Sequence, residues 1–321
     1  MKKLQKFTEP QITSTYAGEF AGQYIAAALL SARTLDNKLI TIHPNVKFKE
    51  VLQKVAVDGI VQDASCDFVT SGSVVLSERI LEPKELQVNL QLCKQEFVDS
   101  WEALQLGYSA FDSIPANFND FLISYVGGKV AEATEQSIWQ GTNVNGQFLG
   151  FESAFSASIA AGGATAVLSA KSGSTVISGS VTSANVLDKL NSVVNTIPDT
   201  VYGKEDVLLY VSTNVAKAYQ QALAGGAIGA NGWNNQMNVG EKPFNFNGIE
   251  IVLCPGMSAN KIAAAQKSNL FFGTGLLSDH NEVRVLDMAN LDGSQNYRII
   301  MRYTAGVQFG IGQDIVYYGA F

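Results

Sequence analysis

The longest regular pattern of hydrophobic and polar positions lies at residues 115–141. Pro115 suits the first position of a helix, and Gly141 suits its C-terminal end. Polar residues, Glu132 and Glu135 among them, fall mostly outside the apolar stripe. The pattern predicts one amphipathic helix of roughly 39 Å, at about 1.5 Å per residue. The stripe recurs at steps of three and four residues and consists of Phe118, Phe121, Leu122, Tyr125, Val126, Val130, Ala133 and Ile138.

Two adjacent glycines interrupt this predicted helix. Gly127 and Gly128 each weaken it by about 1 kcal/mol relative to alanine. Because they lack side chains, we expect another backbone to lie close to the helix there. Taken alone, the stretch also fits a core helix of an ordinary globular domain.

A strict period of two marks the C-terminal part of the chain. Polar residues such as Arg298 and Arg302 alternate there with apolar ones, which predicts a long β-strand. Fifteen residues at about 3.3 Å each reach roughly 50 Å. Gly306, Gly310 and Gly312 are positions at which the strand can bend or bulge. The apolar positions are Tyr297, Ile299, Met301, Tyr303, Ala305, Val307, Phe309 and Ile311.

Two extended segments flank a polar stretch in the N-terminal third. Residues 39–57 and 79–93 have strand-like alternation, and 79–93 reads as one long strand, whereas 57–77 is loop-like. A hairpin with so few apolar anchors is hard to hold in place within a compact monomer. We therefore expect it to lie on a neighbouring subunit. The alternative is an ordinary three-stranded sheet with a surface loop.

The rest of the chain predicts a mixture of helices and strands. Residues 153–183 are rich in Ala, Gly, Ser and Thr, and they predict either short strands at 166–168 and 175–181 or a mobile loop. Ser183 is the expected N-cap of the helix that follows. The mixture of elements after it marks a second module at about 184–295. Expected helices are 16–32, 96–110, 184–196 and 214–224, and expected strands are 206–212, 244–253, 261–265 and 282–287, with a short segment at 269–277.

Composition adds an indication about partners. Hydrophobic residues make up 46% of the chain, which is ordinary, but charged residues make up only 16%, against about 25% in typical domains. Interface cores are depleted in charge, so this composition suggests that partners cover much of the surface. The net charge is −7, and Lys2, Lys3 and Lys6 form the only basic cluster, which argues against a nucleic-acid-binding patch. With no apolar run near 20 residues and no signal peptide, we expect a protein made in a reducing cytosol, with no membrane span.

No group of residues has the spacing of a catalytic or metal site. His43 and His280 lie far apart, and the three cysteines show no CxxC spacing. The glycines at 127–128 and 225–232 lack the pattern of a phosphate loop or of a dinucleotide site. We therefore expect no catalytic residue, no cofactor and no metal.

The order of the segments resembles that of tailed-bacteriophage major capsid proteins of the Hong Kong 97 type. The resemblance rests on the 79–93 segment RILEPKELQVNLQLC, on the 115–141 helix and on the final strand that begins YRIIMRY at Tyr297. It implies an α+β fold with an N-terminal arm and helix at 1–44 and an E-loop at 45–92. It further implies a peripheral domain at 93–183 with its spine helix at 115–141, an axial domain at 184–296, and a C-terminal strand at 297–321 that returns to the peripheral domain.

The same resemblance implies a function. The chain would assemble with itself into hexamers and pentamers that form an icosahedral shell around double-stranded DNA, without sequence-specific binding. It would be made in the host cytoplasm, reside in the virion, and work with a portal and with a separate scaffolding protein. Met1 starts almost directly in the arm, which fits either a separate scaffolding protein or none at all. No crosslinking Lys–Asn pair is located. The expected interface residues are Glu78, Arg79, Glu82 and Lys84 on the excursion, and Trp233, Asn234 and Asn235 at the hub of a capsomer.

Two other functions stay open at the level of the sequence. An encapsulin-type nanocompartment shell would share the fold but enclose protein cargo. A two-module α/β enzyme or ligand-binding protein would instead be a stable monomer or small oligomer with a polar pocket at the module junction.

Overall fold

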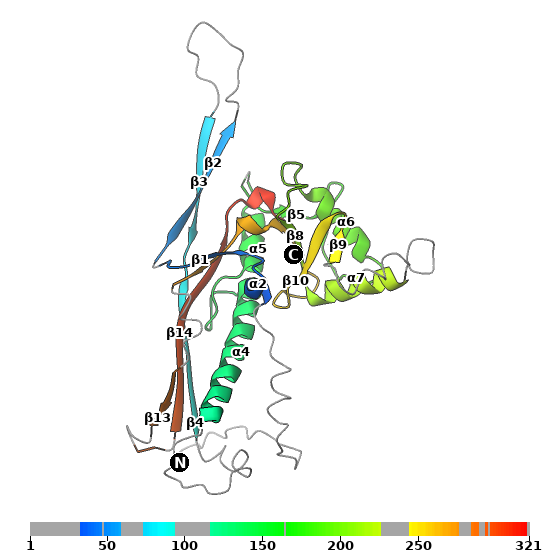
Figure 1. Ribbon diagram of the computed structural model, residues 1–321. Coiled ribbons are helices and arrows are strands. Elements are labelled where there is room, and N and C mark those ends of the chain that lie inside the picture. Colours follow the sequence, from blue (N-terminus) through cyan, green and yellow to red (C-terminus); the bar gives the residue numbers. More distant parts are fainter. Residues whose placement is uncertain are drawn as a thin grey trace, which may run out of the picture. The chain divides into compact units, whose positions relative to one another are not determined.

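The computed structural model describes residues 33–46, 48–58, 73–93, 116–163, 165–225, 244–275, 284–288, 293–294 and 296–319 (Figure 1). The helices expected at 16–32 and 96–110 lie outside these residues. The chain divides into two compact units. The first unit comprises Met1–Leu29, Asn89–Gly128 and Val283–Ile300, and the second comprises Leu30–Val88, Lys129–Glu282 and Met301–Phe321.

A six-stranded sheet forms the centre of the second unit. The middle strand β8 is buried at every position, as its continuous apolar run predicts. It pairs in parallel with β10 and antiparallel with β11. The strand order is β5 (Leu168–Ser169), β15 (Val316–Tyr318), β11 (Ile262–Gln266), β8 (Val207–Val211), β10 (Ile249–Leu253) and β9 (Phe244–Phe246).

Helices α6 (Val186–Thr196) and α7 (Thr213–Gly225) pack on one face of this sheet, where Leu190, Leu209 and Val215 belong to one buried cluster. The prediction that Ser183 caps α6 is wrong. The residue before the helix is Asn185, whose side chain instead accepts a hydrogen bond from the Thr182 N–H and so closes the preceding turn.

The opposite face of the sheet packs against aromatic side chains. Alternate strand residues point this way, and the rings of Trp139 and Tyr210 lie 5.5 Å apart, as do those of Phe155 and Tyr317. Phe151 and Phe155 come from α5 (Phe151–Ala161). The sequence predicted short strands or a mobile loop at 153–183, so the helical part of this stretch was missed. Short strands do occur later in it, at β5, β6 (Lys171–Ser172) and β7 (Thr175–Val176).

The predicted helix at 115–141 and the predicted C-terminal strand are both confirmed. The helix is α4 (Ala116–Gln140). The strand is β14 (Asn296–Phe309), in which every odd position from Tyr297 to Phe309 is buried while Arg298 and Arg302 are exposed. The strand ends before Ile311, where the chain turns through the 3-10 helix Gly312–Asp314 into β15.

Strand β14 belongs to a five-stranded sheet. The path is β1 (Thr41–His43), β12 (Leu270–Thr274), β14 and β13 (Arg284–Asp287), and β4 (Lys84–Cys93) also pairs with β14. Strands β12 and β13 lie within the sequence range 184–296 but belong to the five-stranded sheet. Strands β5 and β15 lie outside that range but belong to the six-stranded sheet. Sheet membership therefore does not follow the boundaries of the expected second module.

A two-stranded hairpin makes up the third sheet. Strands β2 (Glu50–Asp58) and β3 (Ser73–Leu81) pair antiparallel over nine residues, and in the described part of the chain neither strand joins another sheet. The expected single strand at 79–93 is wrong, because it breaks at Glu82 and Pro83 into the end of β3 and the start of β4. Proline cannot donate to a strand ladder, which accounts for the break.

One further sequence expectation needs correction. The expected strand at 244–253 is the hairpin β9–β10, which turns at Asn247 (φ 49°) and Gly248 (φ 81°). An Asn-Gly pair with two positive φ angles is the preferred two-residue turn between antiparallel strands. The remaining short helices are α2 (Arg33–Asp36) and the 3-10 helix Lys267–Asn269. Within the described residues, no helix has the length and apolar character needed to cross a membrane.

Candidate functional site

The charged residues expected at a subunit interface lie at the base of the β2–β3 hairpin. We use "hairpin base" for residues 79–84, where β3 ends and β4 begins. Arg79, Glu82 and Lys84 belong to it, and Glu78 directly precedes it opposite Gln53 of β2. Trp233, Asn234 and Asn235 lie outside the described residues. The structure thus brings four of the seven expected residues together.

Arg79 is held within its own subunit by an aromatic ring and a carbonyl. Its guanidinium lies 3.9 Å from the centre of the Phe309 ring, within the range of a cation–π interaction. It also donates a hydrogen bond of 3.4 Å to the Thr165 carbonyl. Burial lowers the pKa of Arg79, but arginine stays charged at neutral pH. The side chain therefore fixes β3 to the end of β14.

Lys84 fixes the start of β4 to a nearby turn. Its ammonium donates to the carbonyl oxygens of Asn143 and Gln147, at 3.1 and 3.0 Å, and to the Asn143 Oδ1 at 3.3 Å. Asn143 has a positive φ of 63°, a conformation that asparagine tolerates better than most residues. Three oxygen acceptors on one ammonium match the donor capacity of lysine.

Two further polar pairs lie beside the hairpin base. Lys49 and Glu82 form an ion pair of 3.0 Å between exposed side chains, a kind of pair that contributes about 0–1 kcal/mol. His43 at the end of β1 lies 2.9 Å from Glu50 at the start of β2, and its ring meets Phe271 edge-on at 5.1 Å. All of these contacts are made within one subunit. That Arg79, Glu82 and Lys84 also make contacts between subunits stays a prediction.

Exposed apolar side chains lie next to this charged group. Val51 and Ile80 are directly opposite each other in the hairpin and are 47% and 51% exposed, and Phe48 just before β2 is 84% exposed. Sequence reasoning missed this patch. The available signal was the shared parity of Val51, Val55 and Val57, since alternate strand residues share a face. An exposed apolar patch of this kind is typical of interaction surfaces.

A buried carboxyl lies elsewhere in the second unit, on the C-terminal half of α4. Glu135, expected on the polar side of the helix, is only 2% exposed. Its Oε2 accepts a hydrogen bond of 3.0 Å from the Thr34 N–H, and its Oε1 accepts one of 2.6 Å from the Thr34 hydroxyl. The indole N–H of Trp139 donates to that same hydroxyl oxygen at 3.0 Å. The expectation was wrong because donors about 100 residues away satisfy the carboxyl.

Burial shifts the pKa of two carboxyls of this unit upward. Desolvation raises the pKa of Glu135, and hydrogen bonds from Thr34 oppose the shift. Desolvation also raises the pKa of Glu152 on α5, opposed by Ser258, whose N–H donates to Oε1 at 2.7 Å, and by the charge of Lys261. Both glutamates contact the loop between β10 and β11, since Glu135 also packs on Gly256.

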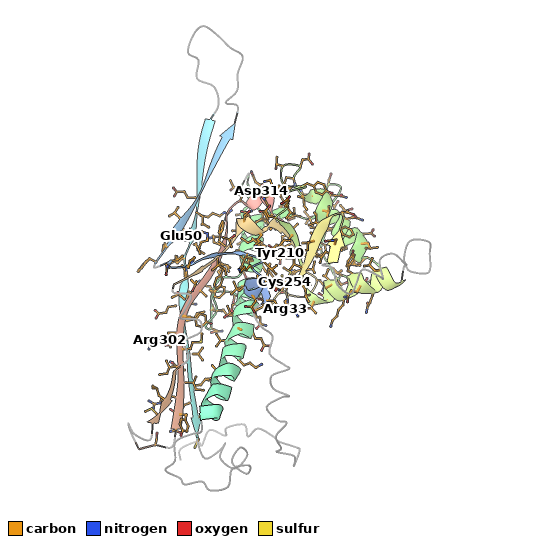
Figure 2. The ribbon with its side chains drawn as sticks, in the orientation of Figure 1. Arg33, Glu50, Tyr210, Cys254, Arg302 and Asp314 are labelled. Carbon is orange, nitrogen blue, oxygen red and sulfur yellow. The ribbon has the colours of Figure 1, made fainter. Side chains whose placement is uncertain are left out.

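The interior around this loop includes Tyr210 and Cys254, which Figure 2 labels. Both are fully buried, and burial raises the pKa of the Cys254 thiol, so the thiol is protonated at neutral pH. The Tyr210 hydroxyl donates to the Leu39 carbonyl at 2.7 Å. Among the described residues, no cluster of three or more His, Cys, Asp or Glu side chains forms a metal site. These polar groups therefore bind one another and hold the segments of the unit together.

Comparison with known proteins shows the class of fold. No protein-family model matches the chain, and no curated protein matches its sequence. Solved structures do match over most of the chain, and they are capsids, so the chain has the fold of phage capsid subunits.

Three of these structures illustrate the match. The capsid of an empty GTA particle, computed with C5 symmetry, is 15% identical with a TM-score of 0.60, over 97% of this chain and 94% of that one. The cyanophage A-1(L) capsid is 12% identical with a TM-score of 0.60, over 92% and 94%. The capsid of Myoviridae phage XM1 is 12% identical with a TM-score of 0.54, over 89% and 90%.

Proposed function

We propose that this chain is the major capsid protein of a tailed bacteriophage. Copies of it assemble into hexamers and pentamers, which form an icosahedral shell around double-stranded DNA. The observation that carries the proposal is the similarity to the GTA and cyanophage A-1(L) capsids over more than nine-tenths of each chain. A likeness of this extent includes the long strand and the unsupported hairpin, and is not limited to a common α/β core.

The β2–β3 hairpin supports the same proposal on physical grounds. An isolated two-stranded hairpin is marginally stable in water, yet this one has nine paired residues and no further strand neighbour among the described residues. Exposed Val51 and Ile80 lie at its start. A second copy of the chain that covers this surface would complete its burial.

The parts of the Hong Kong 97 type fold are assigned as follows in this proposal. The E-loop is 45–92, which includes the β2–β3 hairpin, and the spine helix is α4. The peripheral domain is 93–183 and the axial domain is 184–296, and 297–321 returns to the peripheral domain. The proposed contacts between subunits are Glu78, Arg79, Glu82 and Lys84 on the excursion, and Trp233, Asn234 and Asn235 at the capsomer hub.

The proposed role is structural, without catalysis or a cofactor. A net charge of −7 suits a shell wall from which DNA is released easily, because tight binding to phosphates requires many basic side chains. The protein would be made in the host cytoplasm, reside in the virion, and assemble with a portal and a separate scaffolding protein.

The test is the mass and shape of the purified full chain. We expect megadalton particles by light scattering and closed shells or capsomers by electron microscopy, with nuclease-protected DNA in particles from infected cells. A monodisperse species of 34.4 kDa at all concentrations would overturn the proposal. Shells that enclose protein instead of DNA would favour a nanocompartment.

A further inference from the structure

The hairpin base lies against two glycines that face each other in the five-stranded sheet. Gly273 of β12 and Gly306 of β14 are register partners. We call them the glycine pair. The segment Leu81–Glu82–Pro83 lies over them, because the sheet has no side chain at these two positions.

The distances show how close this approach is. A methyl group added to Gly306 would lie 2.9 Å from the Glu82 carbonyl oxygen and 2.9 Å from the Pro83 Cα. Both are backbone atoms, so the backbone of the hairpin base would have to move. A methyl group on Gly273 would lie 2.9 Å from the Leu81 Cδ2 and 3.2 Å from the Pro83 Cγ, which are side-chain atoms. Alanine is therefore more disruptive at 306 than at 273.

Residues at the end of β14 make further contacts with the hairpin base. Leu81 is fully buried, and the Gln308 side chain donates a hydrogen bond of 2.9 Å to the Ile80 carbonyl. Arg79 lies over the ring of Phe309. The contacts follow the two strands in order. Gly306 lies against residues 82–83, Gln308 binds Ile80, and Phe309 contacts Arg79, so the start of the hairpin is fixed at several successive positions.

We propose that the glycine pair fixes the angle at which the β2–β3 hairpin leaves its own subunit, and that this angle sets the curvature of the shell. Arg79, Glu82 and Lys84 then position the hairpin within one subunit. The proposal rests on the proposed function, because curvature has a meaning only if copies assemble.

The length of the hairpin explains why a small change at its base would matter. Nine residues at about 3.3 Å each carry the end of the paired strands about 30 Å from the glycine pair. A backbone shift of a few tenths of an ångström at the base is enlarged over that length. Contacts made by the far part of the hairpin would move by more than a side chain can compensate.

The experiment compares full-length Gly306→Ala, Gly273→Ala and wild type. We expect both variants to fold, as judged by circular dichroism and urea unfolding. Electron microscopy should show loss of particles of wild-type diameter for Gly306→Ala and a smaller shift or broadening of the diameter for Gly273→Ala. Gly310→Ala is the matched control, because its methyl group would contact the Asn269 and Phe271 side chains and not the hairpin base.

The outcomes separate this inference from the proposed function. Folded Gly306→Ala and Gly273→Ala that form particles of wild-type diameter and yield would overturn the inference, as would an equal shift in Gly310→Ala. If Gly306→Ala does not fold, Gly273→Ala decides in the same assay, because only side chains must move there. A wild-type chain that does not assemble at all contradicts the proposed function itself.

Discussion

At the scale of single residues, the buried carboxyl of Glu135 gives the clearest energetic consequence. It accepts two hydrogen bonds from Thr34 and none from a Lys or Arg among the described residues. A nearby titratable group is the Cys254 thiol, whose own pKa is raised by burial. Desolvation raises the pKa of Glu135 above its usual 4.5. The folded state therefore binds a proton more tightly than the unfolded state does.

This raised pKa predicts a pH dependence of stability. Below pH 4.5 the carboxyl is protonated in both states, and its contribution is fully present. The free energy of unfolding then falls as pH rises from the unfolded-state pKa through the raised folded-state pKa, with a slope of at most about 1.4 kcal/mol per pH unit. Urea unfolding of Glu135→Gln should lack this fall, so its deficit relative to wild type should be largest at acid pH and shrink toward neutral pH.

The matched control is Glu132→Gln, which removes an exposed carboxylate three residues earlier on α4, in an ion pair of 2.8 Å with Lys129. It should leave the difference between acid and neutral pH as in wild type. An identical pH profile for Glu135→Gln and wild type would show that Glu135 titrates alike in both states. Glu152→Gln should change the profile in the same direction, because burial also raises the pKa of Glu152.

The residues of this cluster also show what the sequence could not give. The helical period correctly placed Val126 and Ile138 inside, but Ala133 of the same stripe is exposed. It could not place Glu135 or Trp139 inside, because their partner Thr34 lies about 100 residues away and no local pattern connects them. The intramolecular acceptors of Arg79 and Lys84, which are Thr165 and Asn143, carry no signal in the sequence either.

At the scale of elements, Gly127 of α4 and Gly256 of the β10–β11 loop have opposite surroundings, one open and one crowded. The sequence suggested that another backbone lies close to Gly127, but a methyl group there would meet no atom within 4 Å. The close approach occurs instead at Gly256, where a methyl group would lie 2.2 Å from the Glu135 carbonyl oxygen. A glycine in a helix thus need not mark a contact.

Alanine substitutions at these two glycines test the assignment. Gly127→Ala should stabilise the protein by about 1 kcal/mol, because alanine favours the helix and nothing obstructs its methyl group. Gly256→Ala should destabilise it by roughly 1–3 kcal/mol, as overpacking of a core does. Both values come from urea unfolding at one pH. A destabilised Gly127→Ala would mean that α4 has a neighbour at that point.

Elements with a strict period were predicted well and elements with special turns were not. The alternation of β14 and the apolar run of β8 survive in the structure residue by residue. Helix α5 was missed because small residues obscure its period, in which Phe151 and Phe155 are the clearest marks. The Asn247–Gly248 turn was also missed, although that pair of residues is a strong hairpin signal.

At the scale of the whole molecule, the order of segments was the informative property. The long helix and the final strand were readable in sequence, and the order of the segments pointed to the capsid fold that the solved structures share. The pairing of the hairpin was not, because residues 73–77, expected in a loop, form the start of β3. Which strands share a sheet was not readable. The pairings of β1 with β12 and of β4 with β14 join positions about 200 residues apart, and such contacts depend on tertiary packing.

The last prediction concerns the exposed apolar pair of the hairpin. Replacing Val51 and Ile80 together by threonine keeps β-branched side chains but removes apolar surface that is about half exposed in the single chain. The stability of the subunit should change by no more than about 0.5 kcal/mol for each site, as for other surface substitutions. If a second copy covers this face, the concentration needed for shell assembly should rise at least about tenfold, because each aliphatic side chain contributes roughly 1.5–3 kcal/mol on burial.

Val176→Thr serves as the comparison, because Val176 is 41% exposed on β7, which pairs antiparallel with β6 in a separate two-stranded sheet. It removes a similar apolar group far along the chain from the β2–β3 hairpin, so light scattering should give it the wild-type assembly concentration. Unchanged assembly of the double variant would mean that this face stays open to solvent in the particle. The hairpin would then have to be held by its backbone edges or by residues near its tip, because Val51 and Ile80 would add nothing to the contact between copies.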